Sequence, residues 1–559
     1  MDAHSMSVTS AARKKTSRIY QDLKTTRLYC ASPRRQSIMD EVLKLENLDP
    51  SRRPHIGIVG AGFAGLRCAD VLLRNGFRVT ILEARNRLGG RIFQERLPNG
   101  HLIDIGANWI HGTTENPIMD LVKETKTTVG VWDSHSCVYD EDGQLLTPEE
   151  GEKYSTLMWN IIEAAFEHSN KHGANIDPGR SLLDFFQEEV VKRIPDSQEG
   201  YQRQRRILLQ MAELWGNFVG SPLKTQSLKF FWLEECIEGE NLFCAGTYNK
   251  VLEKVSQPAI EGADIHYQTR ISEIYGKSST RKNMTRVRTT EDQVFEFDEV
   301  VVTCPLGWLK KNLQAFSPPL PDRVCQGIQN IGYGSLEKVY ISFGTAFWLT
   351  PSPTDNRIVQ GFCQWLAPNY APDSNPNRHL TEIVELGSLG AAAHPTLLFY
   401  LYGDQSHHLT TTLRSLPSQK DRDSFLHAYF KPYYSRLPSY DESNPACQPT
   451  ACFATDWLGD ELAGHGSYSN FQAGLREGDK DIVAMRNGVP KEGVWLAGEH
   501  TAPFVALGTV TGAYWSGEHV GRRIAQGYWG AREREKERGV GVVGVVGVVD
   551  GEKGGEVQG

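Results

Sequence analysis

The 559-residue sequence has no C-x-x-C pair among its ten cysteines. The absence of such pairs argues against a zinc site and a disulfide framework, and it favours a reducing compartment. The sequence also lacks an apolar stretch of ~18 residues, the length needed to cross a bilayer. Its N-terminus lacks the apolar core of a secretory signal. We therefore expect no metal site, no membrane span and no secretion.

The chain lacks an excess of positive charge. It carries 60 Lys and Arg against 68 Asp and Glu, which gives a formal net charge of −8. Nucleic-acid binders rely on a basic surface, so we expect no nucleic-acid partner. A mildly acidic protein suits a cationic ligand, although simple solubility explains the same charge.

Both ends of the chain are poor in core-forming patterns. Residues 1–53 are basic and contain several serines, which is typical of a disordered extension and also of a weak transit peptide. Residues 531–559 form a charge run that could continue a helix, followed by a Gly/Val low-complexity tail. We expect a cytoplasmic protein, with a mitochondrial location as the alternative, and the oligomeric state stays open.

Strand-like and helix-like segments alternate between these ends. Apolar strand-like runs occur at 56–59, 79–82, 300–303, 339–343 and 494–496, and helix-like segments at 65–74, 155–168, 203–218 and 513–526. Their mixture along the whole length predicts an α/β plus α+β architecture.

The strongest local motif is a strand that runs into G-x-G-x-x-G. Its glycines are Gly60, Gly62 and Gly65, and after a helical stretch a second strand ends on Glu83. Gly60 permits a tight turn, Gly62 lets backbone N–H groups approach a pyrophosphate, and Gly65 lets the helix pack closely. Glu83 would accept hydrogen bonds from a ribose diol, and the helix N-terminus would face the phosphates. The complete unit predicts a dinucleotide site.

NAD and FAD both bind such a unit, and the following residues distinguish them. Gly89, Gly90 and Arg91 could bring main chain and a guanidinium to the second phosphate and the ribityl chain. The run 56–91 resembles the FAD fingerprint of the flavin amine oxidase superfamily. That superfamily includes monoamine, polyamine and L-amino acid oxidases and the flavin-dependent histone demethylases.

The resemblance continues in family order over roughly 54–527. The matching segments are 104–112 (passing the flavin ring), 300–310 (VVT-x-PLG-x-LK), 332–340 (the lysine segment), 456–469 (W...GSYS) and 494–513 (the closing strand and helix). A chance motif match does not recur in this way. The sequence is therefore identified as a member of this superfamily, with FAD as the expected cofactor.

The resemblance implies a discontinuous Rossmann-like FAD-binding domain with an interleaved substrate domain of mixed sheet plus helices. We expect the FAD domain to comprise residues 54–115, 241–310 and 484–530. The substrate domain would then comprise residues 116–240 and 311–483.

The resemblance also assigns the catalytic side chains. Lys338, just before an apolar strand, would hold a water against flavin N5; a solvent-exposed lysine at a strand edge is the alternative. His111 would orient or deprotonate the incoming ammonium, with a purely structural histidine as the alternative. Tyr468 and Thr509 would align the amine. Monoamine oxidases carry two tyrosines there, so this pair points to longer aliphatic amines.

Several further residues are expected around the flavin. Ser467 stands where monoamine oxidases carry the cysteine bonded to the flavin, so we expect non-covalent FAD. Glu499 would contact the ribityl or ribose part, and N–H groups near Thr509 and Val510 would lie by the pyrimidine carbonyl. The expected cofactor-binding residues are Gly60, Gly62, Gly65, Glu83, Arg85, Gly90, Arg91, Trp109, Ile271, Glu499, Thr509 and Val510.

An acidic run precedes residue 241. Glu234, Glu235, Glu238 and Glu240 lie beside the aromatic stretch 230–232. This cluster could recognise the distal ammonium of a polyamine, and a solvated acidic turn explains it equally well.

The expected activity is oxidation of secondary amines of spermine, spermidine or their acetylated forms. The imine formed would hydrolyse to an aldehyde plus an amine, while dioxygen becomes hydrogen peroxide. Which polyamine is used and which C–N bond is cut stay open.

Three other functions were considered. A histone-lysine demethylase would carry a SWIRM domain, for which residues 1–53 are too short and polar, and a long helical hairpin, for which no heptad stretch is visible. An L-amino acid oxidase needs an arginine for the substrate carboxylate, which the sequence does not place. A non-catalytic FAD-binding scaffold is disfavoured because Lys338, Tyr468 and Glu499 are all present.

Overall fold

The computed structural model describes residues 53–132, 137–280 and 283–540. The chain divides into two compact units, and residues 53–522 form the one that contains the candidate site. The expected N-terminal extension (1–52) and residues 541–559 of the Gly/Val tail lie outside the described residues. The last helix, α15 (Val510–Val540), includes the C-terminal charge run, as the sequence suggested.

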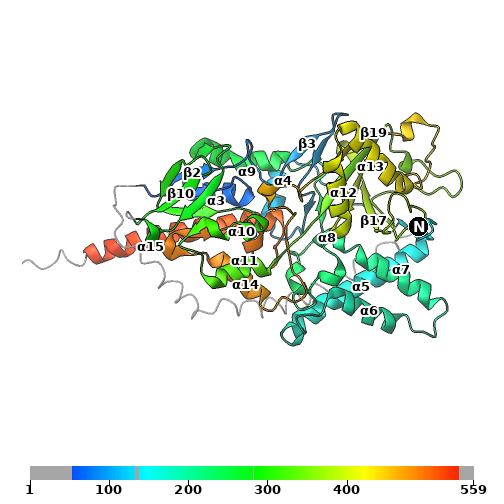
Figure 1. Cartoon of the computed structure of the whole chain (residues 1–559), viewed down its shortest axis with the longest axis horizontal. Coiled ribbons are helices and arrows are strands. Elements are labelled where there is room, and N and C mark those ends of the chain that lie inside the picture. The colour runs from blue at the N-terminus through cyan, green and yellow to red at the C-terminus, as the bar shows by residue number, and fades with distance from the viewer. Residues whose placement is uncertain (1–52, 133–136, 281–282, 541–559) are drawn as a thin grey trace, which may run out of the picture. The chain divides into compact units, whose positions relative to one another are not determined.

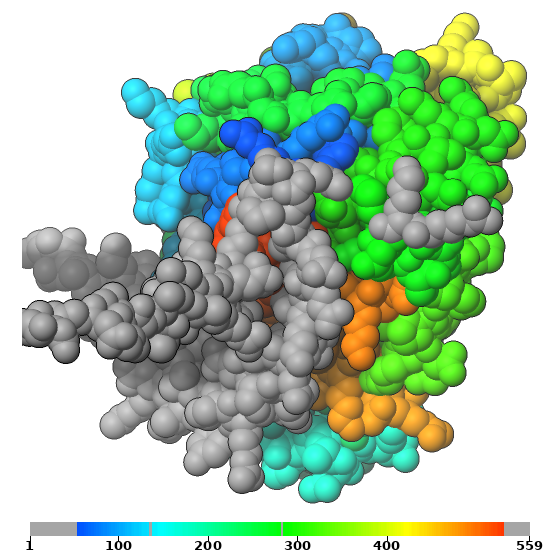
Figure 2. Space-filling model, turned by 90° about the vertical axis from the view of Figure 1, so that its left-hand side faces the viewer, coloured from blue at the N-terminus to red at the C-terminus, as the bar shows by residue number. Residues whose placement is uncertain are grey.

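A five-stranded parallel sheet carries the glycine-rich motif. Its strands are β1 (His55–Val59), β2 (Arg78–Leu82), β8 (Asp264–His266), β12 (Glu299–Val302) and β21 (Val494–Leu496). They are ordered β21-β12-β1-β2-β8, and every neighbouring pair is parallel. One sheet therefore joins three distant stretches of chain, whose blue, green and orange surfaces share one face in Figure 2. The expected domain boundaries themselves stay a prediction.

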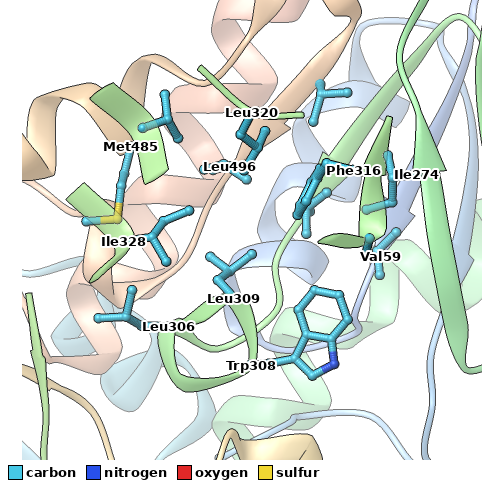
Figure 3. Close-up of a cluster of buried hydrophobic side chains, with 14 of the residues drawn as sticks. Val59, Ile274, Leu306, Trp308, Leu309, Phe316, Leu320, Ile328, Met485 and Leu496 are labelled. Carbon is cyan, nitrogen blue, oxygen red and sulfur yellow. The ribbon is translucent and has the colours of Figure 1, made fainter. Parts of the chain in front are cut away.

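A hydrophobic core forms where helices pack against this sheet. It brings together side chains from β1, β21, α10 (Leu306–Lys311), α11 (Asp322–Asn330), α14 (Gly478–Asn487) and the neighbouring strand β9 (Ile271–Tyr275). Figure 3 shows ten of them: Val59, Ile274, Leu306, Trp308, Leu309, Phe316, Leu320, Ile328, Met485 and Leu496. On another part of the sheet, α3 (Phe63–Arg74) packs against α9 (Asn249–Gly262).

A second, six-stranded sheet has the order β19-β15-β18-β17-β16-β6. Its strands are β6 (Cys137–Tyr139), β15 (Glu337–Phe343), β16 (Phe362–Trp365), β17 (Thr381–Glu385), β18 (Thr396–Leu401) and β19 (Pro449–Ala454). All neighbours are antiparallel except β16 and β6. Helices α12 (Gly403–Ser415) and α13 (Gln419–Tyr434) cover one face, as Figure 1 shows. The opposite face carries Lys338.

A group of helices packs separately around its own core. It contains α5 (Pro148–His172), α6 (Leu182–Arg193), α7 (Tyr201–Glu213) and α8 (Gly216–Val219), the first three lying together in Figure 1. The single helix expected at 203–218 is wrong, because α7 ends at Glu213 and α8 begins at Gly216. A Cβ on Gly216 would lie 2.2 Å from the Tyr402 ring. The start of α8 can therefore pack against this ring only because residue 216 is a glycine.

The remaining elements are short. They are β3 (Gln94–Arg96), β4 (Leu102–Asp104), β5 (Trp109–Ile110), α4 (Pro117–Thr125), β7 (Leu242–Phe243), β10 (Thr285–Thr289), β11 (Val294–Phe297), β13 (Phe316–Ser317), β14 (Gly332–Tyr333) and β20 (Ser469–Asn470). The expected mixed α/β content is confirmed. Within the described ranges, no helix combines the length and apolar character needed to cross a membrane. The same residues contain no group of three or more His, Cys, Asp or Glu arranged to hold a metal ion.

Candidate active site

The glycine-rich turn has the geometry that a bound phosphate requires. Gly60 has φ +101°, a conformation that favours glycine. A Cβ on Gly65 would lie 2.1 Å from the Gly60 carbonyl oxygen, whereas a Cβ on Gly62 would meet nothing within 4 Å. Helix α3 begins after Gly62 without a side-chain cap. Its first N–H groups are therefore accessible to an anion, and the residues present fit a dinucleotide.

The Glu83 carboxylate stabilises this turn. Glu83 is buried; its Oε2 accepts the Ala61 N–H at 2.7 Å and its Oε1 accepts the Arg85 N–H at 2.7 Å. The Arg85 guanidinium pairs with Asp460, with Nη2–O distances of 2.9 and 2.7 Å. The structure thus brings both expected cofactor-binding side chains next to the turn, where their roles toward a ribose or phosphate stay predictions.

Arg91 and Glu499 form the centre of a second polar group. Arg91 Nη1 lies 3.0 Å from Glu499 Oε1 and donates to the Ser467 carbonyl oxygen at 2.6 Å. Ser469 also donates to Glu499 through its hydroxyl at 2.5 Å. Burial acts to raise the pKa of Glu499. The charges of Arg91 and His500 and the hydrogen bonds from Ser469 and Arg91 together outweigh burial, so this pKa lies below its ordinary value. Ser467 is buried and accepts the Leu336 N–H at 3.2 Å.

Glycine also defines the neighbouring segment. Gly90 has φ +60°, and a Cβ there would lie 3.3 Å from the Gly62 Cα, so this segment packs against the phosphate turn. A Cβ on Gly106 would lie 1.6 Å from the Arg91 carbonyl oxygen. The stretch from Asp104 to Gly106 therefore passes directly over the backbone of Arg91.

Three other expected cofactor residues contribute to the protein's own structure. Thr509 caps α15: its hydroxyl donates to the Ala506 carbonyl at 2.8 Å and accepts the Gly512 N–H at 3.0 Å. Val510 is the first residue of that helix, as expected. Ile271 is 8% exposed and packs in the core of Figure 3.

Lys338 lies within β15, not before it, and is 5% exposed. The alternative prediction, a solvent-exposed lysine at a strand edge, is therefore wrong, because the side chain is buried. Nζ donates to the carbonyl oxygens of Gly106 and, at 3.4 Å, Asp104. The lysine therefore contacts the very segment that was expected to pass the flavin ring.

The charges of Lys338 and Asp104 are both disfavoured by burial. Burial lowers the pKa of Lys338 to about 7, although the charges of Asp104 and Glu337 oppose the change. Burial raises the pKa of Asp104 to about 7, against the Gln94 hydrogen bond and the Lys338 charge. Titration near neutrality is typical of groups that move protons in an active site.

His111 and Tyr468 are uncharged near neutral pH. The half-buried imidazole of His111 has its pKa lowered to about 4 by desolvation, although a hydrogen bond to Asn241 opposes this. The Tyr468 hydroxyl donates to the Phe218 carbonyl at 2.8 Å. Burial raises the pKa of Tyr468 far above its ordinary value, and the next largest influences are Glu234 and Tyr400.

The acidic run does not act as one cluster. Glu238 and Glu240 are exposed, and Glu235 accepts a hydrogen bond from Asn170 Nδ2 at 2.9 Å. Glu234 Oε1 is buried and has no hydrogen-bond partner in the part of the chain that the structure describes. Burial raises the pKa of Glu234 to about 8. Of the four carboxylates, only Glu234 is available inside the fold to meet a cationic ligand.

Sequence reasoning missed Glu382. This residue of β17 is 3% exposed and pairs with Tyr400 of β18, which in turn pairs with Lys338 of β15. Trp109 reaches the same place, because its Nε1 donates to the Tyr400 hydroxyl at 3.0 Å. The available signal was a pair of glutamates, Glu382 and Glu385, in the strand-like segment 381–386, which is unusual for a buried strand.

Comparisons with known proteins identify the family and the fold of this chain. A family model described as flavin-containing amine oxidoreductase matches residues 63–525. The FLOWERING LOCUS D protein of Arabidopsis thaliana is 25% identical over 85% of this chain and 56% of its own length. A rice (Oryza sativa subsp. japonica) protein named lysine-specific histone demethylase 1 homolog 3 is 24% identical over 84% of this chain and 54% of its own length. The Arabidopsis probable polyamine oxidase 4 is 28% identical over 56% and 62%, respectively.

A solved structure of a putrescine oxidase variant has the same fold. The two structures superpose with a TM-score of 0.61 at 18% identity, over 85% of this chain and 99% of the other. The chain spans 54–62% of the length of the three relatives named above.

Proposed function

The chain belongs to the flavin-containing amine oxidoreductase family, and from this premise we propose that it is an FAD-dependent polyamine oxidase. The observation that carries the proposal is Lys338. It is buried, bonded to the backbone of residues 104–106, and has its pKa lowered to about 7 by burial. A lysine with a purely structural role would gain nothing that offsets the desolvation of its charged amine.

The proposed FAD site is Rossmann-like. The strand order across the parallel sheet, the capless start of α3 and the open approach to Gly62 all suit a dinucleotide. The residues that would hold it are those around the turn and the Arg91–Glu499 pair, namely Gly60, Gly62, Gly65, Glu83, Arg85, Gly90, Arg91 and Glu499. When bound, FAD would accept a hydride equivalent from the α-carbon of the amine and pass both electrons to dioxygen, which leaves as hydrogen peroxide.

The chain's own residues would prepare the amine. A polyamine arrives protonated, and only its free amine gives up a hydride readily. The imidazole of His111 is neutral near neutral pH because its pKa is lowered to about 4, which makes it a weak base; it would therefore orient the amine through a hydrogen bond. Tyr468, with its hydroxyl engaged by Phe218, would serve as a rigid apolar wall. The amine of Lys338, neutral in part, would hold a water and accept its proton.

FAD attachment is proposed to be non-covalent, because a serine hydroxyl at position 467 replaces the tethering thiol and hydrogen-bonds to Leu336 instead. Precipitation of the purified protein with trichloroacetic acid should leave yellow flavin in the supernatant. Colour that stays with the precipitate would overturn this part of the proposal.

A second candidate function is demethylation of a methylated lysine side chain. It is favoured by one observation: two relatives named lysine-specific histone demethylase 1 homologs, from rice and Arabidopsis, align over 84% and 85% of this chain. Another relative of that name aligns over 52%, and polyamine oxidase 4 aligns over 56%. Both functions oxidise a secondary or tertiary amine within a larger cationic molecule.

A peroxide assay distinguishes the candidates. The panel would contain spermine, spermidine, N-acetylspermine, butylamine, an L-amino acid and a peptide with a dimethylated lysine, each with wild-type protein and Lys338→Met. We expect peroxide from the polyamines and a strongly reduced rate in the variant. Peroxide from the peptide alone would establish the second function, and none from any amine would refute both.

A further inference from the structure

We propose that Glu382, with Asn217 and Gln364, binds a second ammonium group of the substrate, remote from the one that is oxidised. The inference rests on the proposed amine oxidation, and it adds a feature of the substrate: two cationic nitrogens at a set separation.

The first argument is strand register. Gln364, Glu382, Tyr400 and Lys338 are successive Cα partners across β16, β17, β18 and β15. Side chains at directly paired positions point to the same face of a sheet. Glu382 therefore faces the same side as Lys338, two strands away, a distance of roughly 10 Å.

The second argument is the balance of donors and acceptors around Glu382. Its carboxylate accepts Gln364 Nε2 at 2.7 Å and Asn217 Nδ2 at 3.4 Å. The side-chain oxygens of both amides are buried and have no partner among the described residues. No lysine, arginine or histidine of the described ranges lies within 4.0 Å of Glu382, since no ion pair includes it. The two amides bonded to Glu382 thus each keep a buried oxygen without a donor, beside a carboxylate that is not paired with a cation of the described residues.

An ammonium group has the complementary chemistry. It carries three donors and no acceptor, so it can bond the carboxylate and both amide oxygens at once. A buried carboxylate without a cation is costly, and one with a hydrogen-bonded cation is not. Burial raises the pKa of Glu382 to about 7, with Gln364 and Asn217 opposing. This is the condition of a carboxyl group that lacks its counter-ion.

Aromatic rings flank the same place. Phe362 lies two residues before Gln364 in β16, on the same face, and Trp109 stacks on it at 5.8 Å between ring centroids. Both rings are only half-buried, so a ligand can reach them. Aromatic faces attract alkylammonium groups, and the methylene chain between two amines would pack on them.

The test compares two ligands with the same central chain. Spermidine and N-propylbutylamine share the chain of three carbons, one secondary nitrogen and four carbons, but the second lacks both terminal amino groups. Binding to flavin-loaded protein would be measured by titration calorimetry under nitrogen for wild type, Glu382→Gln and Glu382→Asp. We expect Glu382→Gln to weaken spermidine binding about tenfold to a hundredfold, the range for one charge-assisted hydrogen bond, with N-propylbutylamine unchanged. Glu382→Asp should restore part of the loss.

A matched control is available in the same strand. Glu385 is buried, but its carboxylate already accepts hydrogen bonds from Trp132, Trp348 and Gly361. Glu385→Gln should therefore change the affinities for the two ligands equally. Equal losses in Glu382→Gln, unchanged spermidine binding, or a wild-type protein that binds neither ligand would each overturn the inference. Tight, Glu382-dependent spermidine binding without peroxide would instead refute only the proposed oxidation.

Discussion

The glycine-rich turn and the face of the six-stranded sheet that carries Lys338 differ in how their buried charges are compensated. In the turn, the carboxylate of Glu83 is buried yet receives two backbone N–H groups. On the sheet face, Glu382 and Lys338 are equally buried, but neither has an oppositely charged side chain in direct contact. The buried carboxylate of the turn is thus satisfied by the protein's own backbone, whereas the buried charges of the sheet face have no counter-ion in direct contact among the described residues.

This difference indicates how the two halves of the site would work. The turn is shaped by backbone geometry, through glycines at positions where a Cβ would collide or block approach, so it suits a cofactor that stays bound. The sheet face retains displaced pKa values, which suits groups that exchange protons or partners in each catalytic cycle.

The largest effect is expected from glycine substitutions in the turn. Gly65→Ala places a Cβ 2.1 Å from the backbone of Gly60 and should abolish flavin binding and lower the melting temperature. In Gly62→Ala the new Cβ meets no protein atom within 4 Å, so the flavin-free variant should have the same melting temperature as flavin-free wild type. Its flavin content should nevertheless fall. Flavin-to-protein absorbance ratios and thermal melts measure both. Normal flavin content in Gly65→Ala would contradict the comparison.

The next largest effect is expected for Lys338→Met. Methionine keeps the apolar stem, so the protein should fold and bind flavin. The amine that would hold a water is lost, and the turnover number and kcat/KM should fall together by about tenfold to a thousandfold. Stopped-flow measurement of flavin reduction and reoxidation separates the two half-reactions. Wild-type rates in both would show that Lys338 is structural only.

A third prediction concerns pH. If the neutral form of Lys338 is required, kcat/KM rises with pH through about 7, because protonated lysine cannot accept a proton. The rise should persist in His111→Asn. The imidazole of His111 in the wild-type protein has its pKa lowered to about 4, which lies outside the measured range of pH 5.5–8. It should disappear in Lys338→Met. Loss of the rise in His111→Asn instead would reassign the titrating group.

The smallest effect is expected for stability without substrate. The pKa of Glu382 is raised from 4.5 to about 7, so its contribution to folding is full below pH 4.5 and is lost as the pH rises through 7. Glu382→Gln removes this titration. The free energy of unfolding of the variant minus that of wild type should therefore be larger at pH 8 than at pH 4.5, by on the order of 2 kcal/mol. Urea unfolding of the substrate-free protein at both pH values measures it, and a constant difference would argue that Glu382 does not titrate in this range.

The sequence predicted the turn well because its information is local. Gly60, Gly62, Gly65 and Glu83 all lie within one strand–helix–strand unit, and the structure has β1, α3 and β2 where they were expected. The family was confirmed for a related reason: several short motifs recur in one order. The interruption after α7 was missed, because it depends on the ring of Tyr402, far along the chain.

The sequence by itself determined the glycine-rich turn, the family and the candidate lysine, since each depends on residue types at fixed spacing. Only the tertiary structure decided that Lys338 is buried against residues 104–106, that Glu234 separates from its acidic neighbours, and that Glu382 shares a face with Lys338. The physical reason is that burial and partner geometry set the charge of a side chain. Both depend on the register of strands joined by long connections, which no local pattern encodes.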